Sequence, residues 1–218
     1  GAWQGGWIFD AAWGARPLAW LMIRRMYDTN KINFELYGTT VTSEKAITDT
    51  YWHHISCVFS YNEDLENNME IFIDGVSDKK INTPNVGNLA AISNLRIGGG
   101  IGGNYFKGKL SDFRIYNWAL TAHDVKELNE SMQIEPPTDV MLENENSLVG
   151  HWPLDVSNGA DISGNGYIGT LNGGITLSQN GGPSSGPCLE FDGTGYIDLM
   201  TYKDSFITAF HGNVSYTI

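Results

Sequence analysis

Short apolar segments separated by turn residues recur along the whole chain of 218 residues, and they limit the possible folds more than any other feature. The segments are rich in aromatic and β-branched residues, and Gly, Asn and Asp stand between them. Examples are KINFELYG, WHHISCVFSY, NMEIFIDGV and GKLSDFRIYN, followed later by LVGHWPLD, GPCLEFDG and GYIDLMTY. Each is long enough for a β-strand and too short for a long helix. The pattern predicts an all-β fold in which antiparallel strands form a sandwich.

One segment departs from this pattern and predicts a short helix at residues 122–130. In ALTAHDVKELNES, Thr121 is a suitable N-cap, and Asp124 follows it three residues later as in a capping box. The apolar positions then form a stripe of Leu120, Val125 and Leu128. We expect little helix elsewhere.

A polar stretch containing two prolines, SMQIEPPTDVMLENENS, follows the helix and indicates a linker at residues 131–146. Strand-like segments resume after it, so the sequence predicts two parts, residues 1–130 and residues 147–218. The later part is too short to bury a large core alone. Neither part is therefore expected to be stable as an isolated piece.

The net charge of −12 disfavours partners that need a basic surface, namely nucleic acid and anionic membranes. No apolar run approaches the roughly 20 residues that span a bilayer. The chain begins with Gly1 and shows no signal peptide, so we interpret it as a mature or excised segment. Asn129-Glu-Ser131 and Asn213-Val-Ser215 are acceptor sequences for N-glycosylation. Together these features predict a secreted, extracellular protein.

The cysteines, Cys57 and Cys188, leave two alternatives open. Alternation along HHISCVFSY places Cys57 on the same face as Ile55 and Phe59, the expected core face. Cys188 alternates with its apolar neighbours in GPCLEF and is expected to point away from them. The two residues form either one disulfide or two buried free thiols.

Several segments resemble a laminin-G-like domain, which has the jelly-roll β-sandwich of the concanavalin A-like lectins and glucanases. YWHHISCVFSYNEDLENNMEIFIDGV is similar to the middle of that domain, and FKGKLSDFRIYNWALTAHDVKEL to its closing strand and terminal helix. After the linker, LVGHWPLD, DISGNGYIGTL and CLEFDGTGYIDL resemble its first strands. The resemblance covers nearly the whole chain and implies a jelly-roll fold.

The order of these motifs is shifted relative to the family, because the closing part precedes the opening part. Two explanations are open. The chain is a window from a tandem array of such domains, or its order is permuted or completed by strand exchange with a neighbouring subunit. In either case, other copies of the same domain are expected partners.

The resemblance also implies a structural calcium site, since relatives of this type commonly hold calcium in the loop after the first strand. If LVGHWPLD pairs with KLSDFRIYN as in the family, Asp112 lies near the loop that carries Asp161 and Asn165. These side chains, the carbonyl of Gly164 and, as an additional candidate, Asp192 would supply oxygen ligands for Ca²⁺. The alternative is a loop in which Asp161 and Asn165 bond only to the backbone.

No strand carries the pattern expected of an enzyme with this fold. Glucanase relatives have carboxylates at alternate positions, Glu-x-Asp-x-x-Glu, and this pattern does not occur here. His53 and His54 have no paired nucleophile, and at most one of them is expected to pack inward. The chain is therefore not expected to be an enzyme.

Two functions remain as hypotheses. The first is a structural or adhesive repeat of an extracellular, filamentous or tandem assembly. The second is a lectin-like module that binds a glycan through exposed aromatic rings beside polar groups. The candidate glycan-binding residues are Trp118, Tyr105 and Asn104, whereas Trp52 and Trp152 stand in strand motifs and are predicted to pack in the core.

Overall fold

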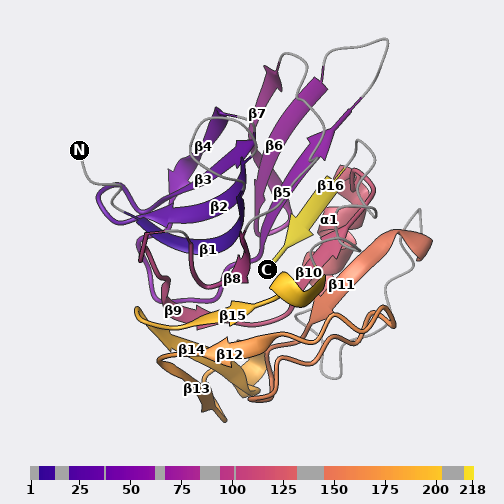
Figure 1. Cartoon of the computed structure of the whole chain (residues 1–218). Helices are drawn as coiled ribbons and strands as arrows, with labels where there is room; N and C mark the ends of the chain where they lie inside the picture. The colour runs from indigo at the N-terminus through magenta and orange to yellow at the C-terminus, as the bar shows by residue number, and fades with distance from the viewer. Residues whose placement is uncertain are drawn as a thin grey trace.

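The computed structural model of the chain describes residues 5–12, 20–36, 38–61, 67–83, 94–100, 102–131, 145–202 and 214–218. Its strands form a seven-stranded sheet, a six-stranded sheet and a smaller three-stranded sheet (Figure 1). The strand pairings are antiparallel throughout these sheets. The predicted all-β jelly-roll sandwich is thereby confirmed.

The elements have the following bounds. The seven-stranded sheet contains, in order across the sheet, β12 (Thr170–Asn172), β15 (Tyr196–Asp198), β8 (Asn94–Ile97), β1 (Gly5–Ala12), β2 (Trp20–Met26), β3 (Lys31–Leu36) and β4 (Thr39–Ala46). The six-stranded sheet contains β11 (Leu148–Trp152), β10 (Phe113–Tyr116), β16 (Val214–Thr217), β5 (Ile55–Ser60), β6 (Asn67–Ile73) and β7 (Val76–Thr83). The three-stranded sheet contains β13 (Ile175–Ser178), β14 (Cys188–Asp192) and β9 (Lys107–Leu110). The helix α1 (Ala122–Ser131) and the short 3₁₀ turns η1 (Glu145–Ser147), η2 (Pro183–Ser185) and η3 (Met200–Tyr202) complete the described elements.

The core is a continuous apolar cluster to which all three sheets contribute side chains. Its centre holds Phe113, whose ring lies 5.2 Å from that of Phe9 and 6.0 Å from that of Trp152, measured between ring centroids. Trp152 is fully buried, as predicted. Strand β6 shows how the sequence produces this arrangement, because buried residues alternate with half-buried ones along its first half.

Helix α1 begins with the predicted capping pattern. The Thr121 hydroxyl accepts a hydrogen bond from the Asp124 N–H (3.2 Å), and the Asp124 carboxylate accepts one from the Thr121 N–H (2.8 Å). The apolar stripe of the helix packs on the outer face of the six-stranded sheet, against Val58, Phe72 and Tyr116.

Strands from the later part of the chain are inserted among strands from the earlier part. Strand β16 lies between β5 and β10, while β11 pairs with β10, β14 with β9 and β15 with β8. In Figure 1 the orange and yellow strands therefore lie beside purple and magenta ones. Of the predicted linker, Ser131 belongs to α1, Glu145 and Asn146 belong to η1, and residues 132–144 lie outside the described residues. The circular shift relative to the family stays a prediction.

The cysteines are both buried and free. Cys57 belongs to the main core with Ile55 and Phe59, as its alternation predicts, whereas Cys188 lies in the three-stranded sheet. The disulfide alternative is contradicted, because both thiols are free in the structure. Burial raises the pKa of the Cys57 thiol far above its ordinary value.

Within the described ranges, no helix has the length and apolar character needed to cross a membrane.

Candidate functional site

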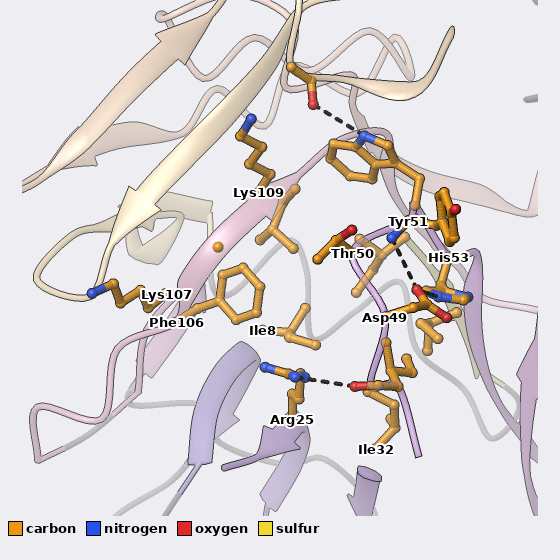
Figure 2. Close-up of a pocket in the computed structure, with 17 residues that line it drawn as sticks. Ile8, Arg25, Ile32, Asp49, Thr50, Tyr51, His53, Phe106, Lys107 and Lys109 are labelled. Atoms are coloured by element: carbon orange, nitrogen blue, oxygen red, sulfur yellow. Dashed lines mark hydrogen bonds and ion pairs between the residues drawn. The ribbon is translucent and has the colours of Figure 1, made fainter. Parts of the chain in front are cut away.

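A cavity of about 380 Å³ opens between the β4–β5 connection and strand β9 (Figure 2). Residues 49–53 form one wall, and residues 106–110 form the other. The base consists of core side chains from β1, β3 and β5 together with Ile218, which follows β16. We call this cavity the Trp52 pocket.

The rim of the Trp52 pocket carries adjacent exposed aromatic side chains. Tyr51 is 81% exposed and Trp52 is 36% exposed. The Trp52 Nε1–H donates to the carbonyl of Gly181 at 3.1 Å, which holds the indole against the far wall. The connection turns here because the Asp49 carboxylate accepts a hydrogen bond from the Tyr51 N–H at 3.0 Å. The prediction that Trp52 packs in the core is wrong, because the strand motif begins only at Ile55.

His53 fastens the β4–β5 connection to the neighbouring sheet. Its Nε2 lies 2.8 Å from the Asp49 carboxylate, and its Nδ1 lies 3.0 Å from the Asp74 carboxylate. Because a carboxylate only accepts, both ring nitrogens donate, and His53 is an imidazolium in this arrangement. Burial lowers the pKa of His53, but the hydrogen bonds to Asp49 and Asp74 outweigh it, so that the net shift is upward.

Asp74 is placed for this contact by the tight turn between β6 and β7. Asp74 and Gly75 have φ angles of 56° and 77°, which the Asp-Gly pair tolerates. The Asp74 carboxylate also accepts from the Lys45 Nζ at 2.9 Å and from the His54 N–H at 3.2 Å. One carboxylate thus connects β4, the β4–β5 connection and the β6–β7 turn.

His54 points the other way and is buried. Burial lowers its pKa to about 4, so the ring is neutral at physiological pH. The prediction that at most one of the two histidines packs inward is confirmed.

The base of the Trp52 pocket is apolar. Figure 2 shows Ile8 and Ile32 below Thr50 and Tyr51, and Phe106 also lines the pocket. Arg25 lies beside them, and its guanidinium is held by Asn30 Oδ1 (2.7 Å) and the Ile47 carbonyl (3.2 Å). The pocket therefore combines an aromatic and charged rim with a hydrocarbon base.

The residues predicted to bind calcium are engaged in hydrogen bonds of the loop itself. Asp161 Oδ1 accepts from the backbone N–H groups of His151 and Ser163, each at 2.9 Å. Asp161 Oδ2 accepts from the Tyr167 N–H at 2.8 Å and from the Ser163 hydroxyl at 2.9 Å. The Asn165 side-chain amide donates to the Val149 carbonyl at 2.9 Å. These contacts match the alternative in which Asp161 and Asn165 bond to the loop backbone.

Asp112 lies close to this loop, as the resemblance implies, but its partners are the side chains of Arg114 and His151. Arg114 donates to both carboxylate oxygens, from Nε and Nη2, each at 2.9 Å. The ring of His151, opposite Arg114 in the β10–β11 pairing, contacts the same carboxylate through Nε2. Burial raises the pKa of Asp112, but His151 and Arg114 more than compensate and bring it to about 2.

In this structure the predicted calcium ligands are engaged by protein groups. The oxygens of Asp161 are taken by N–H and O–H donors, Asp112 is paired with Arg114, and Asp192 lies on β14, where it accepts from Thr194. Gly164 has a φ of 92°, so it serves the turn of the loop. Among the described residues, no group of three or more His, Cys, Asp or Glu side chains could hold a metal. Calcium binding therefore stays a prediction, which chelation tests directly.

The predicted glycan-binding residues are not brought together, and none of them lines the Trp52 pocket. Trp118 is 42% exposed in the connection between β10 and α1. Tyr105 stacks on Tyr196 with 5.9 Å between ring centroids, and the neighbouring Asn104 is half-buried. The sequence signal that identifies the pocket is instead the run Tyr51-Trp52-His53, preceded by Asp49 within one connection.

Of the predicted glycosylation sites, Asn129 is half-buried on α1 and lies against Gly75, while Asn213 is outside the described residues.

Comparison with known proteins gives one match. A laminin-G family model, described as the concanavalin A-like lectin/glucanases superfamily, matches residues 3–126. No curated protein and no solved structure matches the chain.

Proposed function

Because the chain belongs to the concanavalin A-like lectin/glucanases superfamily, we propose that it is a non-catalytic, extracellular glycan-binding module. The observation that supports this proposal is the rim of the Trp52 pocket, where exposed Tyr51 and Trp52 rings stand beside hydrogen-bonding groups. Between the two functions that the sequence left open, this rim favours the lectin.

The rim offers both kinds of contact that a sugar needs. The faces of Tyr51 and Trp52 suit the C–H face of a pyranose ring, and aromatic side chains bury a large area at low entropic cost. The Thr50 hydroxyl donates and accepts, and Asp49 presents a carboxylate to sugar hydroxyl groups. Because His53 holds Asp49 and Trp52 is held by Gly181, the rim is fixed before a ligand arrives.

Removal of either aromatic ring is expected to weaken glycan binding about tenfold or more, since each ring contributes packing area to the complex. The glycan is first identified by screening the protein on an immobilised glycan array, and the affinities of Tyr51→Ala and Trp52→Ala are then measured by calorimetry. Trp118→Ala is the matched control, because Trp118 is 42% exposed and lies outside the pocket. Equal losses in all three variants, or no loss at Tyr51 and Trp52, would contradict the proposal.

Glycan binding and thermal stability are both expected to fall at alkaline pH. The folded-state pKa of His53 lies above its unfolded value near 6.5, so the stabilisation is present below that value and is lost as pH rises through the folded pKa. The measurement is the melting temperature and the affinity between about pH 5 and pH 9. His53→Gln is expected to remove this dependence, while His123→Gln, on the exposed face of α1, is expected to leave it unchanged.

An adhesive or structural assembly is the second candidate function. It is favoured by the position of β16, a strand that enters the middle of the six-stranded sheet from a distant part of the sequence. A neighbouring copy could supply the same strand with the same hydrogen bonds. Light scattering over a range of protein concentrations tests this candidate, and a strictly monomeric protein at every concentration would exclude strand exchange in solution.

A further inference from the structure

The two halves of the Trp52 pocket have different chemistry. The rim carries Asp49, Thr50 and His53 beside the aromatic rings, whereas the base is formed by buried aliphatic and aromatic side chains. The base residues belong to the main core of the sandwich and come from well separated positions in the sequence: Ile8, Ile32, Ile55, Phe106, Leu110 and Ile218. The core therefore extends to the floor of an open cavity.

The apolar base residues have little to offer a sugar hydroxyl group, because their side chains are hydrocarbon and their backbone groups are already paired. The Arg25 guanidinium beside them is held by Asn30 Oδ1 and the Ile47 carbonyl. Ile55 and Ile218 exchange two hydrogen bonds of 2.9 Å each through their N–H and carbonyl groups. The Ile8 carbonyl accepts from the Gly98 N–H at 2.8 Å, and the Ile32 N–H donates to the Ser43 hydroxyl at 3.0 Å. A hydroxyl group placed among these residues would lose its water without gaining a partner.

We infer that the ligand of the Trp52 pocket is a glycan that carries a short hydrocarbon chain. The sugar lies on the rim against Tyr51 and Trp52, and the chain enters the base between Ile8 and Phe106. This inference rests on the proposed function and adds the chemical class of the ligand. It follows from the apolar base, which a plain sugar would leave in contact with water.

Alkyl β-D-glucosides and β-D-galactosides, from methyl to hexyl, are the probes that test the inference. Each added methylene is expected to tighten binding about fourfold until the base is filled. The heat capacity change on binding is expected to become more negative along the series. A sugar acylated with the same chain length distinguishes a chain on the anomeric carbon from an ester on another hydroxyl group.

A variant in the base separates the chain from the sugar. Ile47 lines the pocket and is only half-buried, so Ile47→Asp is expected to fold and to abolish the gain in affinity per methylene. Ile47→Ala, a milder change, is expected to reduce the gain in affinity per methylene without abolishing it. Ile168→Asp is the matched control, because Ile168 is 55% exposed and lies outside the pocket.

The outcomes distinguish the two proposals. An affinity for the glycosides that does not depend on chain length would overturn the inference and leave the glycan-binding proposal in place. Binding of pentanol as strong as that of pentyl glycosides would overturn the glycan-binding proposal, since the sugar would then contribute nothing. A chain-length gain that survives Ile47→Asp would place the chain elsewhere and overturn the inference.

Discussion

Replacing Asp161 by alanine is expected to lower the free energy of unfolding by about 3 kcal/mol, because one carboxylate accepts four hydrogen bonds, one from β11 and three from the loop that follows it. The loss is measured by urea denaturation. The backbone N–H groups of His151, Ser163 and Tyr167 would lose their acceptor together. Since the Trp152 Nε1–H donates to the Tyr167 carbonyl at 2.8 Å, the loop would also loosen around a buried tryptophan.

The same experiment in the presence of a chelator decides the calcium prediction. If the contacts of Asp161 are those of the structure, chelation leaves the unfolding curve of the unmodified protein unchanged, and Asp161→Ala is destabilised equally with and without it. If the loop binds calcium, chelation destabilises only the unmodified protein. Asp78→Ala is the matched control, because that carboxylate accepts from the backbone N–H groups of Glu44 and Lys45 and is outside the predicted ligand set.

Replacing Arg114 by methionine is expected to cost about 4 kcal/mol, which is the largest effect we expect from a single substitution. The Arg114 side chain is 16% exposed and that of Asp112 is 19% exposed, so the substitution leaves a nearly buried carboxylate without its bidentate partner. Of the two side chains described above, only His151 would then contact it. Urea denaturation of Arg114→Met and Arg114→Lys, measured side by side, shows how much of the lost stability depends on the bidentate geometry of the guanidinium.

A double variant separates the loss of the ion pair from the loss of packing. Asp112→Asn in the Arg114→Met background is expected to recover much of the stability, since the unpaired charge is removed and Asn tolerates the φ of 58° at this position. If the double variant is no more stable than Arg114→Met, the cost comes from packing rather than from charge.

The Asp112–Arg114 ion pair also predicts how the stability of the fold decreases at acidic pH. The pKa of Asp112 is about 2 in the folded protein, below the unfolded value near 3.9. Its stabilisation of about 2 kcal/mol is therefore complete above about pH 4 and is lost as pH falls towards 2. Acid unfolding of Asp112→Asn, beside that of the unmodified protein, measures this contribution.

The fold was predictable because its signals are local. Alternating apolar residues identify β6, and the Thr121–Asp124 capping pattern identifies the start of α1. The proximity of Asp112 to the Asp161 loop came from the resemblance, and it is correct. What sequence alone could not show is that Arg114, two residues from Asp112, is the partner of that carboxylate.

The Trp52 pocket was not predictable from the sequence, because its walls come from separate elements. Trp52 resembles a core residue when it is taken as part of the strand that begins at Ile55. Its exposure depends on a turn made by Asp49 and on a carbonyl of Gly181, which lies far along the chain. The adjacent histidines likewise differ in protonation only because Asp49 and Asp74 flank one of them, whereas the other is buried.

The position of β16 has a consequence for how the protein folds during synthesis. A ribosome releases β5 long before residues 214–218, so the nascent chain exposes the edges of β5 and β10 until β16 is made. The pairing of β16 with β5 joins strands that are far apart in the sequence. It is therefore slow compared with the formation of a hairpin such as β6–β7. Because Ile218 also contributes to the base of the Trp52 pocket, ligand capture by a newly made chain would report that β16 has been inserted.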